Sequence, residues 1–162
     1  MTFSKQLLVS IVFKILIVIL TIVTLVLLDP AYTTAYLSIN YEIVIIYLVS
    51  GLTLLYCIVS ILVSIYLAKR SEDTSLTNCS FSEIIFAAGG IMGWLIIIGM
   101  GGTISQRTSS DTGDRFGWIR VTSALNFVCF LVILAVFATK IVREKILHRQ
   151  TQENKYRGVY VQ

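Results

Sequence analysis

Residues 7–28 read LLVSIVFKILIVILTIVTLVLL, an apolar run that contains a single charged residue. About 20 helical residues cross the roughly 30 Å hydrocarbon core of a bilayer, so this run is long enough to span a membrane. Comparable runs occupy residues 43–68, 84–100 and 121–139. Because backbone polar groups in lipid must be satisfied internally, the sequence predicts an all-α membrane protein, a bundle of four transmembrane helices.

The composition agrees with a single membrane domain. The chain has 162 residues, of which 56% are hydrophobic and 14% are charged, whereas soluble domains carry about 25% charged residues. Residues 1–146 are therefore expected to form the transmembrane domain, and residues 147–162 a basic cytoplasmic tail. Three cysteines, two of them inside predicted spans, are too few for a disulfide framework.

The basic residues predict the orientation of the chain. Nine Lys and Arg residues lie on the side of the two termini, and three lie on the other side: Arg107, Arg115 and Arg120. An excess of Lys and Arg marks the cytoplasmic side of a membrane protein, so both termini are expected in the cytoplasm. The outer connections, about residues 29–42 and 101–120, are expected to form an interfacial turn and an irregular, solvated loop.

Ionisable residues inside the spans are the first candidates for a functional role, because an unpaired charge costs about 2 to 3 kcal/mol at mid-membrane. Lys14 lies about 10 Å from the cytoplasmic end of the first span. Glu83 opens the third span from the same side, so the two are predicted to pair if these spans pack together. Glu42 and Arg120 begin the second and fourth spans and suggest a second, outer pair. We interpret both pairs as fixing helix register, in preference to ion transport or a proton relay.

The strongest packing signal lies in the third span, where residues 87–94 read AAGGIMGW. Gly89 and Gly93 have the four-residue spacing that lets helix backbones approach closely in lipid, and Gly90 extends the small surface. The third span is therefore predicted to be the central packing helix. The pattern favours contact within the bundle, and contact with a second protein is the open alternative.

Polar residues of the other spans offer partners for this packing. Ser60 and Ser64 in the second span form a small face that could oppose the glycines. Asn126 in the fourth span, together with Ser123, is expected to hydrogen-bond across the bundle. Aromatic residues are expected to anchor the spans at the interface or to pack inside the bundle: Tyr47, Tyr56, Tyr66, Trp94 and Trp118.

No set of residues indicates catalysis or a cofactor. The single histidine, His148, has no cluster of metal ligands around it in the sequence. The net charge of +4 follows the membrane boundary, so it does not indicate nucleic-acid binding. We therefore expect no enzyme activity, no cofactor and no small-molecule substrate. Cys79 is expected to be a free thiol, with palmitoylation as the alternative.

Three short motifs carry a resemblance to a known group of proteins: Phe13-Lys14, Glu42-Ile43-Val44, and Ser82-Glu83-Ile84-Ile85 followed by the glycines and Trp94. In this arrangement the chain resembles the insect four-span septate-junction proteins snakeskin and pasiflora, and more distantly MARVEL-type proteins. The resemblance covers about residues 6–145. It implies a non-enzymatic plasma-membrane protein at lateral cell junctions, which helps to assemble the occluding junction and its paracellular barrier. Its implied partners are membrane lipids and other junction membrane proteins.

Two other functions remain open at the level of the sequence. One is a MARVEL-like protein of vesicle trafficking and membrane organisation. The other is an auxiliary subunit of a channel or transporter, in which Lys14, Glu83 and Glu42 would contact helices of the partner. Self-association into a homo-oligomer is open for each of these functions.

Overall fold

The computed structural model describes residues 5–28, 41–70, 73–107 and 111–159. These residues form four helices: α1 (Lys5–Leu27), α3 (Tyr41–Arg70), α4 (Asp73–Arg107) and α5 (Asp111–Val159). Each helix contains a stretch that is long and apolar enough to cross a membrane: Leu8–Leu27, Tyr41–Tyr66, Phe81–Gln106 and Asp114–Arg143. The predicted all-helical architecture with four membrane-spanning lengths is confirmed.

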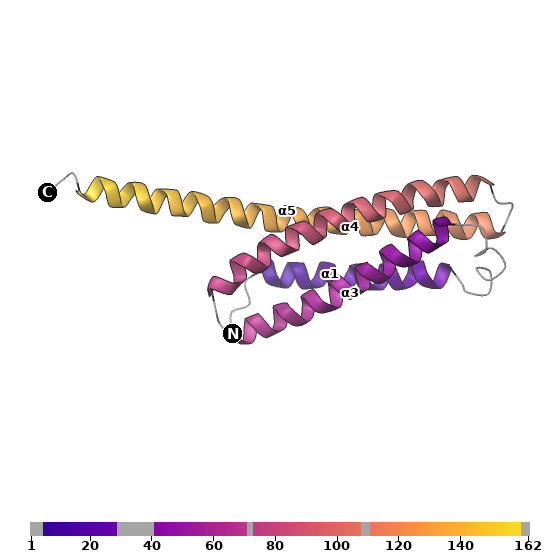
Figure 1. Cartoon of the computed structure of the whole chain (residues 1–162), viewed down its shortest axis with the longest axis horizontal. Helices are drawn as coiled ribbons and strands as arrows, with labels where there is room; N and C mark the ends of the chain where they lie inside the picture. The colour runs from indigo at the N-terminus through magenta and orange to yellow at the C-terminus, as the bar shows by residue number, and fades with distance from the viewer. Residues whose placement is uncertain (1–4, 29–40, 71–72, 108–110, 160–162) are drawn as a thin grey trace.

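The four helices lie side by side along one long axis (Figure 1). Close packing joins α1 with α3, α3 with α4, α4 with α5, and α5 with α1. Going around the bundle, the order is therefore α1, α3, α4, α5. Across the described residues, the remaining pairs, α1 with α4 and α3 with α5, make few or no close backbone contacts, so they occupy opposite corners.

The core takes one fully buried isoleucine from each helix, and these four side chains are Ile17, Ile46, Ile97 and Ile119. Around them, hydroxyl, amide and charged side chains also point inward, whereas large aliphatic side chains such as Val26 and Leu62 are more than half exposed. This distribution suits a lipid environment. Apolar side chains can face the lipid tails at no cost, and polar side chains can form hydrogen bonds between helices inside the bundle.

At the end of the bundle where α4 meets α5, the helices are longer than the sequence predicted. The irregular loop expected within residues 101–120 is wrong for the described part of this range, because α4 continues to Arg107 and α5 starts at Asp111. Gly101 is buried, and a Cβ atom at this glycine would lie 3.4 Å from the carbonyl oxygen of Phe116. This glycine allows the two helix backbones to approach closely, and helical hydrogen bonds satisfy the backbone near the membrane.

α5 extends well beyond the ends of the other helices (Figure 1). The helix continues for 16 residues after Arg143, the end of its membrane-spanning stretch, and reaches Val159. At 1.5 Å per residue this extension is about 24 Å long. Most of the tail predicted at residues 147–162 is therefore helical. Of the turn expected at about residues 29–42, residues 29–40 lie outside the described residues, and Tyr41 and Glu42 belong to α3. The side chains of Cys79 and His148 are also outside the description.

Candidate functional site

The most polar site in the bundle is an ion pair between α1 and α4. Lys14 Nζ lies 2.8 Å from Glu83 Oε1, and the two residues are 0% and 3% exposed. The structure thus brings together the two residues that the sequence suggested as an inner pair. Their helices occupy opposite corners, so the long side chains meet across the bundle interior and not through direct packing of α1 against α4.

α3 supplies two hydroxyl groups to this ion pair. Tyr56 donates its hydroxyl hydrogen bond to Glu83 Oε2, and Ser60 donates to Glu83 Oε1. Lys14 Nζ also donates to Ser60 Oγ at 2.6 Å. Lys14, Tyr56, Ser60 and Glu83 are called the Lys14–Glu83 centre below. Three helices meet in it through hydrogen bonds that are charge-assisted and therefore stronger than neutral ones.

Aromatic rings enclose the ammonium group of Lys14. Its Nζ atom lies 5.8 Å from the ring centroid of Phe137 on α5 and 6.0 Å from that of Tyr56. A cation at this distance from an aromatic face is attracted by the ring quadrupole. All four helices therefore contribute to the surroundings of the one ammonium group.

The two charges of the Lys14–Glu83 centre cancel, and most of its hydrogen-bonding groups are used within the bundle. Removing one charge alone would leave the other unpaired in a dry interior, which costs about 3 to 5 kcal/mol in soluble proteins. The Lys14–Glu83 centre therefore favours one relative placement of α1, α3 and α4. Such a centre is suited to fixing the register of these helices, which is the role predicted from the sequence.

The outer pair suggested by the sequence does not form. Glu42 and Arg120 both belong to the described part of the chain, and no ion pair joins them. Their helices, α3 and α5, stand at opposite corners. Arg120 instead lies along α4, where its Nη1 atom is 3.7 Å from the position of a Cβ on Gly102.

The glycines of α4 separate into two groups. A Cβ on Gly90 would lie 2.6 Å from the Phe130 ring, and a Cβ on Gly93 would lie 2.9 Å from Val49 Cγ1. Gly89 has no atom within 4 Å of its Cβ position. The close contacts inside the bundle are therefore made at Gly90 and Gly93, two of the expected packing glycines. Gly89 makes no such contact within the bundle, and its contact with a second protein stays a prediction.

Two serines of α3 do not oppose these glycines. Ser60 belongs to the Lys14–Glu83 centre, and Ser64, which is 7% exposed, is buried one turn further toward the C-terminal end of α3. The helices α3 and α4 are antiparallel, so Gly93, ten residues beyond Glu83, lies level with Val49 and not with Ser60. The expected small face of Ser60 and Ser64 against the glycines is therefore wrong.

Asn126 is fully buried, yet neither its Oδ1 nor its Nδ2 atom has a hydrogen-bond partner among the described residues. Ser123, its expected companion, donates to the carbonyl oxygen of Ile119 at 2.6 Å. The expected cross-bundle hydrogen bond of Asn126 is absent within the part of the chain that the structure describes. Trp94 is also fully buried, so it packs in the bundle and does not anchor the interface.

Two polar contacts were missed by sequence reasoning. The hydroxyl groups of Thr24 on α1 and Thr122 on α5 lie 2.9 Å apart and join these neighbouring helices. The role of Tyr56 was also missed, although Tyr56 and Ser60 are four residues apart and so share one face of a helix. Reading polar residues at this spacing as one inward face would have placed both beside Glu83.

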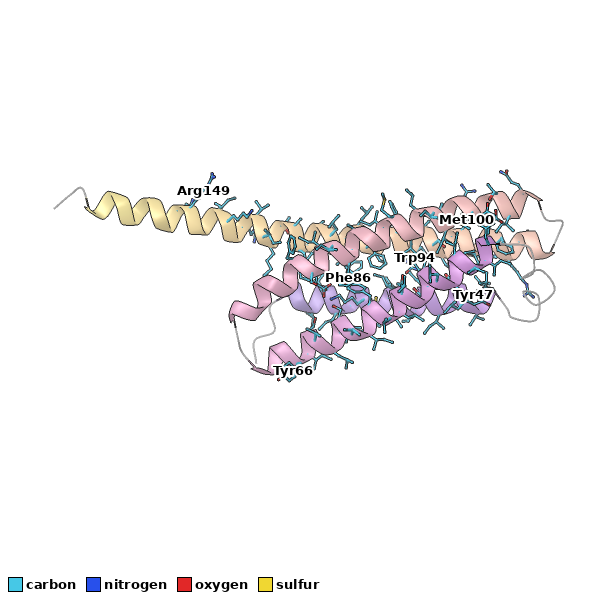
Figure 2. The ribbon with its side chains drawn as sticks, in the orientation of Figure 1. Tyr47, Tyr66, Phe86, Trp94, Met100 and Arg149 are labelled. Carbon is cyan, nitrogen blue, oxygen red and sulfur yellow. The ribbon has the colours of Figure 1, made fainter. Side chains whose placement is uncertain are left out.

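A groove lies between α3 and α4. Its volume is about 540 Å³, and most of its walls are apolar side chains of the two helices. Phe86 on α4, which Figure 2 labels between the two ribbons, stacks on the ring of Tyr56 with centroids 4.8 Å apart. Gly89, Tyr56, Ser60 and Glu83 also line this groove, so the Lys14–Glu83 centre borders it.

The comparisons with known proteins add no relative. No family model, no curated protein and no solved structure matches the chain.

Proposed function

We propose that the protein is a non-enzymatic component of an occluding cell junction of the septate type, located in the lateral plasma membrane. In this proposal it supports junction assembly and the paracellular barrier by lateral contacts between its helices and those of other junction membrane proteins. The motifs around Lys14, Glu42 and Glu83 that resemble snakeskin and pasiflora are its sequence basis. With both termini in the cytoplasm, as the basic residues predict, the α5 extension projects into the cytosol.

The observation that carries this proposal is the distribution of polar groups in the bundle. The charges of Lys14 and Glu83 are paired inside it, whereas the outward faces of the helices are apolar, with Leu48, Leu62 and Met92 each at least 60% exposed. Such a surface can associate sideways within the membrane through close packing. The connection between α4 and α5 is only three residues long, so this connection offers little chain for binding a distant partner.

The same observation disfavours one of the alternatives. An auxiliary subunit was expected to contact a channel through Lys14, Glu83 and Glu42, and it would need these side chains on the lipid-facing surface. Glu42 is only partly buried, so this requirement fails for Lys14 and Glu83 only. They are 0% and 3% exposed and already paired. Exposing either charge to a partner would first require the ion pair to separate in a medium of low polarity.

Imaging of the endogenous, tagged protein in an epithelium tests the proposed function. We expect a continuous signal along lateral cell borders. We also expect that depletion of the protein lets a small tracer pass between cells. Proximity labelling from the cytoplasmic end of α5 should then recover other junction membrane proteins. A punctate endosomal signal with an intact barrier after depletion would instead support the trafficking function and contradict this proposal.

A further inference from the structure

Glu42 and Arg120 carry opposite charges at the end of the bundle where the chain passes from α4 to α5. Glu42 is partly exposed on α3, and Arg120 is exposed on α5. Among the described residues, neither side chain takes part in a hydrogen bond or an ion pair. Within this part of the chain, both charges are therefore available to a group outside the bundle.

The two charges lie at nearly the same depth. Gly93 of α4 is level with Val49 of α3, because a Cβ on Gly93 would lie 2.9 Å from Val49 Cγ1. The two helices are antiparallel, so Glu42, seven residues before Val49, is level with the position seven residues after Gly93. Arg120 of α5 lies beside Gly102, two residues further along α4. At 1.5 Å per residue, the two charges differ in depth by about 3 Å.

The bundle keeps the two charges apart, because no ion pair joins them and their helices stand at opposite corners. A second copy of the chain in the same membrane carries the same charges at the same depth. Arg120 of one copy can therefore meet Glu42 of a neighbouring copy without a vertical shift of either bundle.

The position of Arg120 in the membrane strengthens such a pair. Arg120 lies six residues inside the membrane-spanning stretch Asp114–Arg143, which is about 9 Å at 1.5 Å per residue. Charges are costly within an apolar layer, and opposite charges attract more strongly there than in water. A partner that brings a carboxylate to this depth is therefore favoured.

The helices that carry the two charges also present apolar surface to the surrounding lipid. Val44 and Leu48 on α3, and Val121 and Leu125 on α5, are about half exposed or more. Apolar side chains of adjacent copies can pack against one another by dispersion contacts, as membrane helices do. Close packing of this kind would shield an ion pair between the copies from water.

We propose that the chain associates with a second copy of itself through an intermolecular ion pair between Arg120 of one copy and Glu42 of the other. This self-association refines the lateral association proposed above, on which it rests, by naming the chain itself as a partner. It does not depend on where in the cell the protein is located.

The test measures energy transfer between two full-length copies that carry donor and acceptor fluorescent proteins at their C-termini. Both are expressed in cells that do not make the protein, and specific association gives a transfer that saturates with expression. Glu42→Lys and Arg120→Glu each place two like charges opposite one another. Each variant, paired with itself, should associate at least about tenfold more weakly than the unmodified chain, which corresponds to about 1.4 kcal/mol.

A mixture of the two variants distinguishes a pair between copies from a pair within one copy. The lysine of Glu42→Lys can face the glutamate of Arg120→Glu, and the unchanged Arg120 and Glu42 of the two variants can also face each other. Co-expression should therefore restore transfer to nearly the level of the unmodified chain. Neither variant has complementary charges at these two positions within its own chain, so a pair within one copy would not recover.

Asp114→Lys is the matched control, because Asp114 is exposed near the start of α5 and its charge changes by the same amount as in Glu42→Lys. Its association should equal that of the unmodified chain. A monodisperse peak in size-exclusion chromatography checks that each variant is folded. If charge reversal disturbs folding, Glu42→Gln and Arg120→Gln each remove one charge and should still weaken association.

Three results would overturn the proposal. They are the absence of saturable transfer in the unmodified chain, unchanged association in the folded single variants, and no recovery in the mixture of folded variants. Unchanged association is also the result expected if lipid head groups neutralise the two charges. None of these results bears on the junction location, which imaging tests separately.

Discussion

The ring of Phe130 occupies the space that a Cβ atom on Gly90 would need, with its nearest atom 2.6 Å from that position. Phe130 is 1% exposed, so its ring is held by neighbouring side chains on most of its surface, and one part of it lines the groove between α3 and α4. This contact brings the middle of α4 against α5 and sets their separation. Helix pairs in membranes commonly use glycine in this way, because dispersion contacts replace the hydrophobic effect as the attraction between helices.

Gly90→Leu should therefore destabilise the bundle, because the added side chain forces the ring of Phe130 to move, and overpacking of this kind costs about 1 to 3 kcal/mol. Gly99→Leu should not destabilise it, because no atom lies within 4 Å of the Cβ position of Gly99. Thermal unfolding in detergent, followed by the loss of the monodisperse peak in size-exclusion chromatography, measures the difference. Equal unfolding midpoints for the two variants would show that the Gly90 contact does not set the helix separation.

Thr24 and Thr122 should be energetically coupled. Their hydroxyl groups lie 2.9 Å apart at the contact between α1 and α5, and both residues are buried. A double-mutant cycle with Thr24→Val and Thr122→Val should give a coupling of about 0.6 kcal/mol, the average for hydrogen bonds between membrane helices. Valine keeps the shape of threonine, so the cycle isolates the hydroxyl contact. Strict additivity of the two substitutions would contradict the interhelical hydrogen bond.

Asn126→Leu should leave the stability unchanged or raise it. The amide of Asn126 is fully buried without a partner among the described residues, and an unsatisfied buried polar group costs about 1 to 3 kcal/mol. Leucine has the same branched arrangement of four side-chain heavy atoms and no polar atoms. The unfolding midpoint of the purified variant checks this expectation. A clear loss of stability would mean that the amide makes a favourable contact in the membrane.

Cysteine labelling should report both sides of the membrane. Asp114 and Arg149 are exposed near the two ends of α5, and Cys57 and Cys129 are buried and so should react slowly. In a Cys79→Ser background, a membrane-impermeant maleimide should label Asp114→Cys in intact cells. It should label Arg149→Cys only after permeabilisation. The reverse pattern would place the termini outside and contradict the orientation deduced from the basic residues.

The helices and the inner ion pair could be anticipated from the sequence, because span length and the cost of an unpaired charge in lipid constrain them strongly. The helix faces are marked only in part. Buried polar residues recur at helical spacing on α1, as at Ser10, Lys14 and Thr21, and indicate its inward side. On α4 the adjacent small residues give no such signal, and of the expected packing glycines Gly90 makes a close contact whereas Gly89 makes none. Neighbouring positions on a helix differ by about 100° in direction, enough to move a residue from a contact to the surface.

The order of the helices around the bundle could also not be predicted from the sequence. The expected pair of Glu42 and Arg120 depended on α3 and α5 being neighbours, and they stand at opposite corners. Lys14 and Glu83 are also on opposite corners, yet they meet because both side chains point into the interior. The sequence placed residue 101 beyond the end of the third span, whereas the structure has Gly101 inside α4 and packed against Phe116.

The central claim is that the bundle is organised around the buried pair of Lys14 and Glu83, and a double-mutant cycle of thermal stability tests it most directly. Lys14→Met leaves a carboxylate unpaired, and Glu83→Gln leaves an ammonium unpaired, so each should cost about 3 kcal/mol or more. The double variant removes both charges, and its glutamine can accept a hydrogen bond from one of the two hydroxyl groups of Tyr56 and Ser60 and donate one to the other. We expect the double variant to be more stable than either single variant. A double variant whose loss equals the sum of the two single losses would contradict the claim.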